Sequence, residues 1–370
     1  LFCVLRLIKN FKNKTIDFNF SFVSIAILGF SFLVNGLLMP EYNPLNFLFG
    51  LFLFFFFFVF FYSILPNISI KKEDIVGIAK QTSFFAITVI LEIIAFYIAT
   101  FFVGEDIFLR LSNLLLGWGN KNTVGMLLIV SFCLLFFLFI FETSKRWKIF
   151  SFVLMLFLLI GILLSFSKQT YLAFALIILF YLIYKLIKTN SNCKKNLLII
   201  LSFYSLFFIL LIAFLLYLIF SNTLNIESLS NGRIELWGNA ILSFKNNCLF
   251  GSGFYFIGSD PNINLGFIMP YCFHNTLLQM LGSCGLFGFL SYCLYRIVSI
   301  KEIIKHFDEN KVCFIFGISA MLIMSLVDIH IFDLFGSGIY IFLLAFCVAK
   351  KEDQVVFAKC EAKNEKEENV

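Results

Sequence analysis

Long apolar segments recur along the chain at lengths that suit a lipid bilayer. A helix needs about 20 predominantly apolar residues to cross the hydrocarbon core. The composition agrees, because 61% of the residues are hydrophobic and 14% are charged, whereas a soluble domain has about 25% charged residues. We therefore expect an all-α polytopic membrane protein. Its ten spans are predicted at residues 20–39, 45–65, 81–103, 123–141, 149–166, 170–187, 197–220, 275–297, 312–327 and 335–349.

The distribution of Lys and Arg predicts the orientation of these spans. With the N-terminus inside, the inner segments hold 23 of the 28 basic residues and the outer segments hold 5. Cytoplasmic loops are enriched in Lys and Arg. We therefore expect both termini in the cytoplasm. The net charge of +6 is explained by topology, so it gives no indication of nucleic-acid binding.

Four regions follow from this plan. Residues 1–220 are expected to form transmembrane helices 1 to 7, and residues 221–274 a large external loop. Residues 275–349 then form helices 8 to 10, and residues 350–370 a charged cytoplasmic tail. Loops longer than about 12–15 residues usually have a function or are disordered. The external loop is therefore the segment to inspect for a site.

The loop contains an amphipathic pattern, SNGRIELWGNAILSF at residues 230–244. Ile234, Trp237, Ile241 and Phe244 recur at helical spacing, which predicts a helix lying against the bundle or in the membrane interface. Arg233 falls in its first turn. A helix N-terminus with an Arg binds anions well, but an Arg among lipid headgroups is an equally acceptable interpretation.

Glycines follow the predicted helix in FGSGF. Gly251 and Gly253 permit either a tight turn or a close approach of backbone to a ligand. Cys248 and Cys272 both fall on the predicted outer side, where a disulfide is permitted.

The pair His274-Asn275 begins the eighth predicted span at its outer end. A helix N-terminus favours the neutral imidazole, which is the form that a general base needs. The alternative is structural, with Asn275 capping the helix and His274 in the headgroup layer.

Three other polar features stay open in function. Lys168 is the single charge in a short outer turn, where it serves either a site or the lipid headgroups. Glu92 lies inside the third predicted span and needs a basic or hydrogen-bonding partner. Asp328, His330 and Asp333 share the last outer loop, but this pattern is common in polar loops, so we expect no metal there.

Taken together, the external motifs resemble the O-antigen ligase and polymerase family of bacterial membrane glycosyltransferases. That family shows Gly-Arg followed by Trp, then a Gly-x-Gly turn, then His-Asn opening a span with glycines after it. The matching residues here are Gly232, Arg233, Trp237, Gly251, Gly253, His274, Asn275, Gly282, Gly285 and Gly288. Ser167-Lys168 stands where the family has Ser-Arg, so charge is kept and the bidentate fork is lost.

The resemblance implies a location in the bacterial cytoplasmic membrane, a reaction and its partners. The donor is a glycan on undecaprenyl pyrophosphate, and the acceptor hydroxyl belongs to a second glycan or to lipid A–core. Arg233 and Lys168 are implied to stabilise the departing pyrophosphate, and His274 to accept the acceptor proton. Asn275, Trp237, Gly251 and Gly253 are implied to contact substrate, with no metal or cofactor. Surrounding membrane lipid and a chain-length regulator are possible further partners.

Other functions remain to be weighed. Polymerase and ligase need the same donor site, and we prefer polymerase slightly on general expectation. A lipid-linked oligosaccharide flippase is the alternative of another class, although transporters usually show internal repeats and polar groups at the midplane. A scaffold would leave Arg233 and His274 unexplained.

Overall fold

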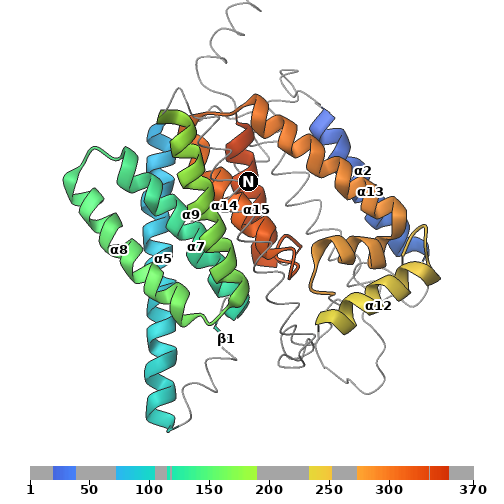
Figure 1. Ribbon diagram of the computed structural model, residues 1–370, viewed down its shortest axis with the longest axis horizontal. Helices are drawn as coiled ribbons and strands as arrows, with labels where there is room; N and C mark the ends of the chain where they lie inside the picture. The colour runs from blue at the N-terminus through green and yellow to red at the C-terminus, as the bar shows by residue number, and fades with distance from the viewer. Residues whose placement is uncertain are drawn as a thin grey trace, which may run out of the picture.

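The chain forms a helical bundle in the computed structural model, which describes residues 20–38, 72–104, 115–116, 119–189, 233–251, 273–332 and 334–349 (Figure 1). The only strands in these ranges are β1 (Leu115–Leu116) and β2 (Gly119–Asn120), which pair antiparallel. A short 3₁₀ helix spans Glu309–Lys311. The α-helices are α2 (Phe20–Leu38), α5 (Lys72–Val103), α7 (Lys121–Phe141), α8 (Lys145–Leu164), α9 (Lys168–Thr189), α12 (Arg233–Asn246), α13 (Thr276–Lys305), α14 (Val312–Met324) and α15 (Leu334–Val348).

The predicted all-helical membrane class is confirmed. Each predicted span within the described residues coincides with a helix, and the remaining two, 45–65 and 197–220, lie outside those residues. In this part of the chain α5, α7, α8, α9 and α13 are long and apolar enough to cross a membrane, and α2 and α15 contain shorter apolar segments. Two boundaries were wrong. Helix α5 begins at Lys72 rather than 81, and α13 continues to Lys305 rather than 297.

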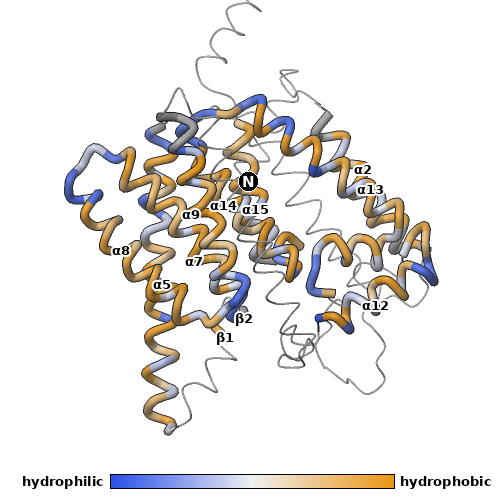
Figure 2. Tube along the Cα trace, in the orientation of Figure 1, coloured by the Kyte–Doolittle hydropathy of each residue, from blue (hydrophilic) through white to orange (hydrophobic). Residues whose placement is uncertain are grey.

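Helix α7 lies at the centre of the bundle and packs against α5, α8 and α14. Most residues of α7 are buried, including Met126, Leu128 and Ile129. Helices α5 and α8 instead expose large apolar side chains, such as Phe84 and Phe102 on α5. Hydrophobic residues run along the middles of the helices and hydrophilic residues gather at their ends (Figure 2). The outward apolar faces are suited to lipid.

Helix α13 is broken at Gly285, which has φ 65° and ψ −164°. The segment that follows α12 enters this break. Its carbonyl oxygens accept hydrogen bonds that begin the second half of α13, from Leu286 N to Cys248 O (2.8 Å) and from Phe287 N to Leu249 O (3.1 Å). These N–H groups would otherwise be orphaned at the start of a new helical segment. The sequence had predicted one uninterrupted span here, because a break at one residue leaves the apolar pattern unchanged.

Glycine is required at both sides of this contact. A Cβ on Gly285 would lie 2.5 Å from Leu249 C and O, and a Cβ on Gly251 would lie 2.4 Å from Ser283 C. Both residues also have positive φ, 65° and 73°, a conformation that residues with side chains rarely adopt. The close approach that the Gly251 motif predicted is therefore an approach of one backbone segment to another.

The predicted amphipathic helix is confirmed as α12, but its buried face differs from the predicted one. Ala240 is fully buried, and Ser243 Oγ donates to Gly282 O of α13 at 2.8 Å. Ile234 and Ile241 of the apolar stripe remain 43% and 44% exposed, so they do not face the bundle, and the membrane interface is the alternative that stays open for them. Small residues let α12 lie directly against α13 (Figure 1), which leaves the two isoleucines facing outward. Residues 230–232, which precede Arg233 in this pattern, lie outside the described residues.

Candidate functional site

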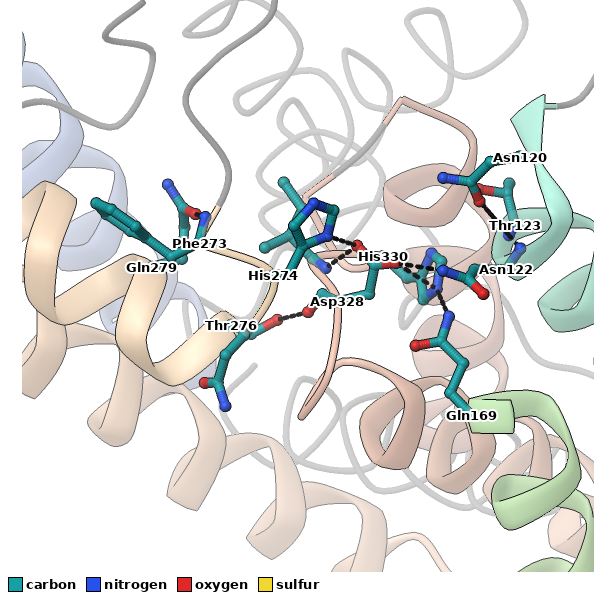
Figure 3. Close-up of polar contacts among 12 residues, drawn as sticks. Asn120, Asn122, Thr123, Gln169, Phe273, His274, Thr276, Gln279, Asp328 and His330 are labelled. Atoms are coloured by element: carbon teal, nitrogen blue, oxygen red, sulfur yellow. Dashed lines mark hydrogen bonds and ion pairs between the residues drawn. The ribbon is translucent and has the colours of Figure 1, made fainter. Parts of the chain in front are cut away.

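One polar contact between distant segments joins His274 to Asp328. His274 Nδ1 lies 3.1 Å from Asp328 Oδ1. His274 precedes α13, and Asp328 lies in the link between α14 and α15 (Figure 3). The His274 side chain is 35% exposed and the Asp328 side chain 7%. One edge of the imidazole is therefore held by a buried carboxylate while the side chain stays accessible.

The backbone of His274 helps to aim this side chain. Its φ is 49°, in the left-handed region. Among residues other than glycine this conformation is uncommon and often marks a functional constraint. The turn that it creates is followed directly by the cap of α13.

Asn275 forms that cap, as one interpretation of the sequence predicted. Its side-chain oxygen accepts from Leu278 N (3.0 Å), and its Nδ2 donates to Leu326 O (2.7 Å). Thr276 N and Oγ1 donate to Ser325 O (2.9 Å) and Asp328 O (3.2 Å). The start of α13 is thus fastened to the α14–α15 link, which places His274 and Asp328 at a fixed separation.

Asp328 is held on its other side by α7. Asn122 Nδ2 donates to Asp328 Oδ2 at 3.0 Å, and Ile329 N donates to Oδ1 at 2.9 Å. Burial alone would raise the pKa of this carboxyl. The hydrogen bond from His274, electrostatic interactions with His330 and His274 and the Ile329 N–H outweigh burial, so the pKa of Asp328 lies well below its ordinary value. Asp328 is a permanent anion at neutral pH.

A second histidine completes this cluster. His330 Nε2 lies 3.8 Å from Asp328 Oδ2 and 3.0 Å from Gln169 Nε2 at the start of α9 (Figure 3). Which of the two nitrogens donates depends on the His330 tautomer and on the orientation of the Gln169 amide. His330 is 2% exposed and Gln169 6% exposed. His330 is therefore an enclosed neighbour of Asp328, whereas His274 is the accessible one.

Three cations lie near this cluster, each at the first position of a helix. The positive charges of Lys168 on α9 and Arg233 on α12 both act on the Lys121 ammonium on α7. None of the three forms an ion pair with a carboxylate among the described residues. Like charges repel, so their gathering is stable only beside an anion or water. Helix N-termini add further positive potential, which makes this end of the bundle suited to phosphate oxygens.

Comparison with known protein families gives a match over part of the chain. Residues 153–293 match the family model described as O-antigen ligase. This segment belongs to the O-antigen ligase family. No functionally curated protein matches the chain. The match supports a function of the O-antigen ligase or polymerase type, in membrane polysaccharide biosynthesis.

The O-antigen ligase segment runs from within α8 to within α13 and contains Lys168, Arg233 and His274. Lys121 and Asn122 of α7 and Asp328 of the α14–α15 link lie outside it. The fold brings these flanking residues to the end of the bundle that holds Lys168, Arg233 and His274. That end is the outer one in the predicted topology.

The other sequence-predicted residues are placed as follows. Trp237 is half-buried, and its Nε1 is buried without a hydrogen-bond partner in the described part of the chain. Gly251 packs against α13, and Cys248 has a free thiol. Cys272, Gly232, Gly253 and Asp333 lie outside the described residues.

Two further expectations concern Glu92 and the last loop. Glu92 on α5 is half-buried, and its Oε2 has no hydrogen-bond partner within the described ranges, so the expected partner is not found there. The described residues also contain no cluster of three or more His, Cys, Asp or Glu side chains suited to a metal. Asp328 and His330 instead belong to the His274 cluster.

Sequence reasoning did not select Asn122, Gln169 or Lys121 as site residues. Each sits at a helix start beside or among the residues that were selected, Gln169 directly after Lys168 and Asn122 directly after Lys121. Polar residues at the outer ends of predicted spans were the available signal. The starts of α7, α9, α12 and α13 meet only in the folded protein, and a single sequence does not reveal which helix ends lie together.

Proposed function

We propose that the chain is a glycosyltransferase that moves a glycan from undecaprenyl pyrophosphate to an acceptor hydroxyl at the outer face of the cytoplasmic membrane. The observation that carries the proposal is the His274–Asp328 pair, 3.1 Å apart, at the end of the bundle where Lys121, Lys168 and Arg233 gather. One group of residues is suited to remove a proton and the other to receive a phosphate leaving group.

His274 is the general base in this proposal. A carboxylate only accepts, so Asp328 fixes the His274 proton on Nδ1 and leaves Nε2 unprotonated. Nε2 takes the proton of the acceptor hydroxyl as its oxygen bonds to the anomeric carbon. The anomeric carbon–oxygen bond to the pyrophosphate breaks, and its electron pair leaves with the lipid pyrophosphate. General base assistance contributes about 10²–10⁴ in rate.

Asp328 changes the electrostatic argument drawn from the sequence. The N-terminus of α13 favours neutral imidazole, but a carboxylate at 3.1 Å favours the imidazolium that forms when the proton is taken. The two influences oppose each other. Asp328 makes His274 a stronger base and stabilises its protonated product, which the helix end alone would not do.

Lys121, Lys168 and Arg233 receive the charge that develops on the leaving pyrophosphate. Fixed cations next to developing charge are usually the largest contribution to catalysis of this kind. Arg233 adds a planar fork that contacts two phosphate oxygens at once. With these cations the proposed step uses no metal or cofactor.

The remaining predicted contacts divide into two groups. Trp237 is retained as a substrate contact, because its buried indole N–H is a donor that a sugar hydroxyl can satisfy. Gly253 keeps that role as an expectation from the family pattern. Asn275 and Gly251 are assigned to the scaffold, since both polar groups of the Asn275 amide and the backbone around Gly251 are used within the protein.

The proposal is tested with purified protein in nanodiscs supplied with undecaprenyl-pyrophosphate oligosaccharide, with and without lipid A–core. A ladder of longer lipid-linked glycans without lipid A–core establishes the polymerase, which we prefer. Transfer only onto lipid A–core establishes the ligase. If folded protein forms no glycosidic product with either acceptor, the glycosyltransferase proposal fails and the flippase becomes the working alternative.

A further inference from the structure

Asn122 occupies the junction between the two halves of the site. It follows Lys121 in the first turn of α7, and its backbone N–H is held by Asn120 Oδ1 at 3.0 Å. Its Nδ2 donates to Asp328 Oδ2 (3.0 Å), and its Oδ1 accepts from Ser167 Oγ (2.9 Å). The amide therefore contacts the carboxylate that faces His274 and the turn that precedes Lys168 (Figure 3).

The two contacts of Asn122 differ in what they require. Asp328 is an acceptor only, so it needs the NH₂ group. Ser167 Oγ is fully buried and donates to the amide oxygen. An amide satisfies both neighbours at once, whereas a carboxylate would satisfy Ser167 and repel Asp328. The pairing thus selects Asn over Asp at this position.

We propose that Asn122 is a positioning residue, whose amide holds the Asp328 carboxylate in place for His274 and ties that carboxylate to the turn bearing Lys168. This inference rests on the proposed function for its catalytic consequence. One amide thus hydrogen-bonds both to Asp328, which faces the proposed base His274, and to Ser167, which directly precedes the cation Lys168. Gln169 supports the far side of Asp328 through His330, at 3.0 Å from His330 Nε2.

The charges around this support determine how a variant responds. His274 faces Asp328, with His330 behind that carboxylate, and Lys121, Lys168 and Arg233 lie toward α7, α9 and α12. Asn122→Asp adds a negative charge beside Asp328 and removes the donor to it. The added charge favours imidazolium at His274, so the neutral imidazole forms only at higher pH.

The test measures how fast diethyl pyrocarbonate modifies His274 as a function of pH, in full-length protein in nanodiscs, read by mass spectrometry of the His274 peptide. The reagent modifies unprotonated imidazole and needs no substrate. The midpoint should move to higher pH by about one unit in Asn122→Asp, and in the same direction but less in Asn122→Ala. Asn246→Asp, an exposed position at the far end of α12, makes the same chemical change and should leave the midpoint unchanged.

His330 reports whether each variant is folded, because it is 2% exposed and should stay unmodified. If Asn122→Asp exposes His330, Asn122→Ala carries the test. In the transfer assay Asn122→Ala should lower kcat about tenfold or more while the donor KM changes less than about twofold, since the three cations remain. Wild-type midpoints in folded Asn122 variants, or an unchanged kcat in Asn122→Ala, would overturn the inference. A shifted midpoint in a protein without transfer activity would instead sink the proposed function and keep the Asn122 link.

Discussion

His274 Nδ1 lies 3.1 Å from Asp328 Oδ1, although 54 positions separate the two residues in the chain. Asn275 and Thr276 fasten the start of α13 to the α14–α15 link and so maintain that distance. The contact with Asp328 orients the His274 ring and leaves Nε2 as its unprotonated nitrogen. It also lies beside three helix starts that carry cations.

Replacing Asp328 with Asn should lower kcat about 10²-fold or more, because the carboxylate that fixes the His274 tautomer and stabilises its charged form is lost. The transfer assay on nanodisc-embedded protein measures the effect. Asp308→Asn is the matched control. Asp308 caps the 3₁₀ helix by accepting from Asn310 N at 3.2 Å, and Asn caps equally well, so its activity should be unchanged. An Asp328→Asn enzyme within twofold of wild type would remove Asp328 from the mechanism.

Each of the three clustered cations should contribute to donor recognition. Lys121→Gln and Lys168→Gln are expected to raise the donor KM about tenfold each, since one charge–phosphate contact contributes about 1–2 kcal/mol. Arg233→Lys should lose part of that contribution, because the charge remains and the fork is gone. Steady-state kinetics over a range of donor concentrations measure these changes.

The control for the cation series is Lys245→Gln. Lys245 is exposed in the last turn of α12, at the opposite end from Arg233. It should leave the donor KM unchanged. Equal effects of Lys245→Gln and Lys168→Gln would mean that general surface charge, not a cation cluster, attracts the donor.

Gly285→Ala should destabilise the fold by about 2 kcal/mol or more, because a Cβ there would lie 2.5 Å from Leu249 backbone atoms at a positive φ. Thermal unfolding of the detergent-solubilised protein measures the change. Gly238→Ala on α12 meets no atom within 4 Å and should be neutral or slightly stabilising. If both variants unfold at the wild-type temperature, the break in α13 is not a tight backbone contact.

The ion pair at the other end of the bundle gives a pH prediction. Glu142 Oε2 lies 2.5 Å from Lys80 Nζ. The hydrogen bond from Lys80, followed by the N–H of Ser144, lowers the pKa of Glu142 from 4.5 to about 2. A lowered pKa stabilises the folded state above the unfolded value, and this contribution is lost as pH falls from about 4.5 to about 2.

Glu142→Gln should therefore lower stability at pH 7 by about 1–2 kcal/mol. The difference from wild type should shrink as pH falls through that window. Unfolding measured at several pH values tests this. A difference that stays constant down to pH 2 would show that the Glu142 charge contributes nothing.

Local patterns predicted much of this site and none of its long-range pairing. Asn275 as a cap and α12 as a helix starting near Arg233 followed from short-range spacing, and the gathering of Lys168 with Arg233 followed from the predicted shared side of the membrane. The Gly285 break did not, because it depends on carbonyls that arrive from residues 248 and 249. Asp328 was assigned only to a polar loop, since its contacts with His274 and Asn122 join positions 54 and 206 residues away.

The most direct test of the central claim is the rate of glycan transfer from undecaprenyl-pyrophosphate oligosaccharide by wild-type protein and by His274→Asn in nanodiscs. Asn tolerates the left-handed backbone at this position, where φ is 49°, so the variant removes the imidazole with little strain. The account predicts a transfer rate about 10²–10⁴-fold lower than that of wild type, with the donor still bound. A folded His274→Asn protein that transfers glycan at the wild-type rate would contradict it.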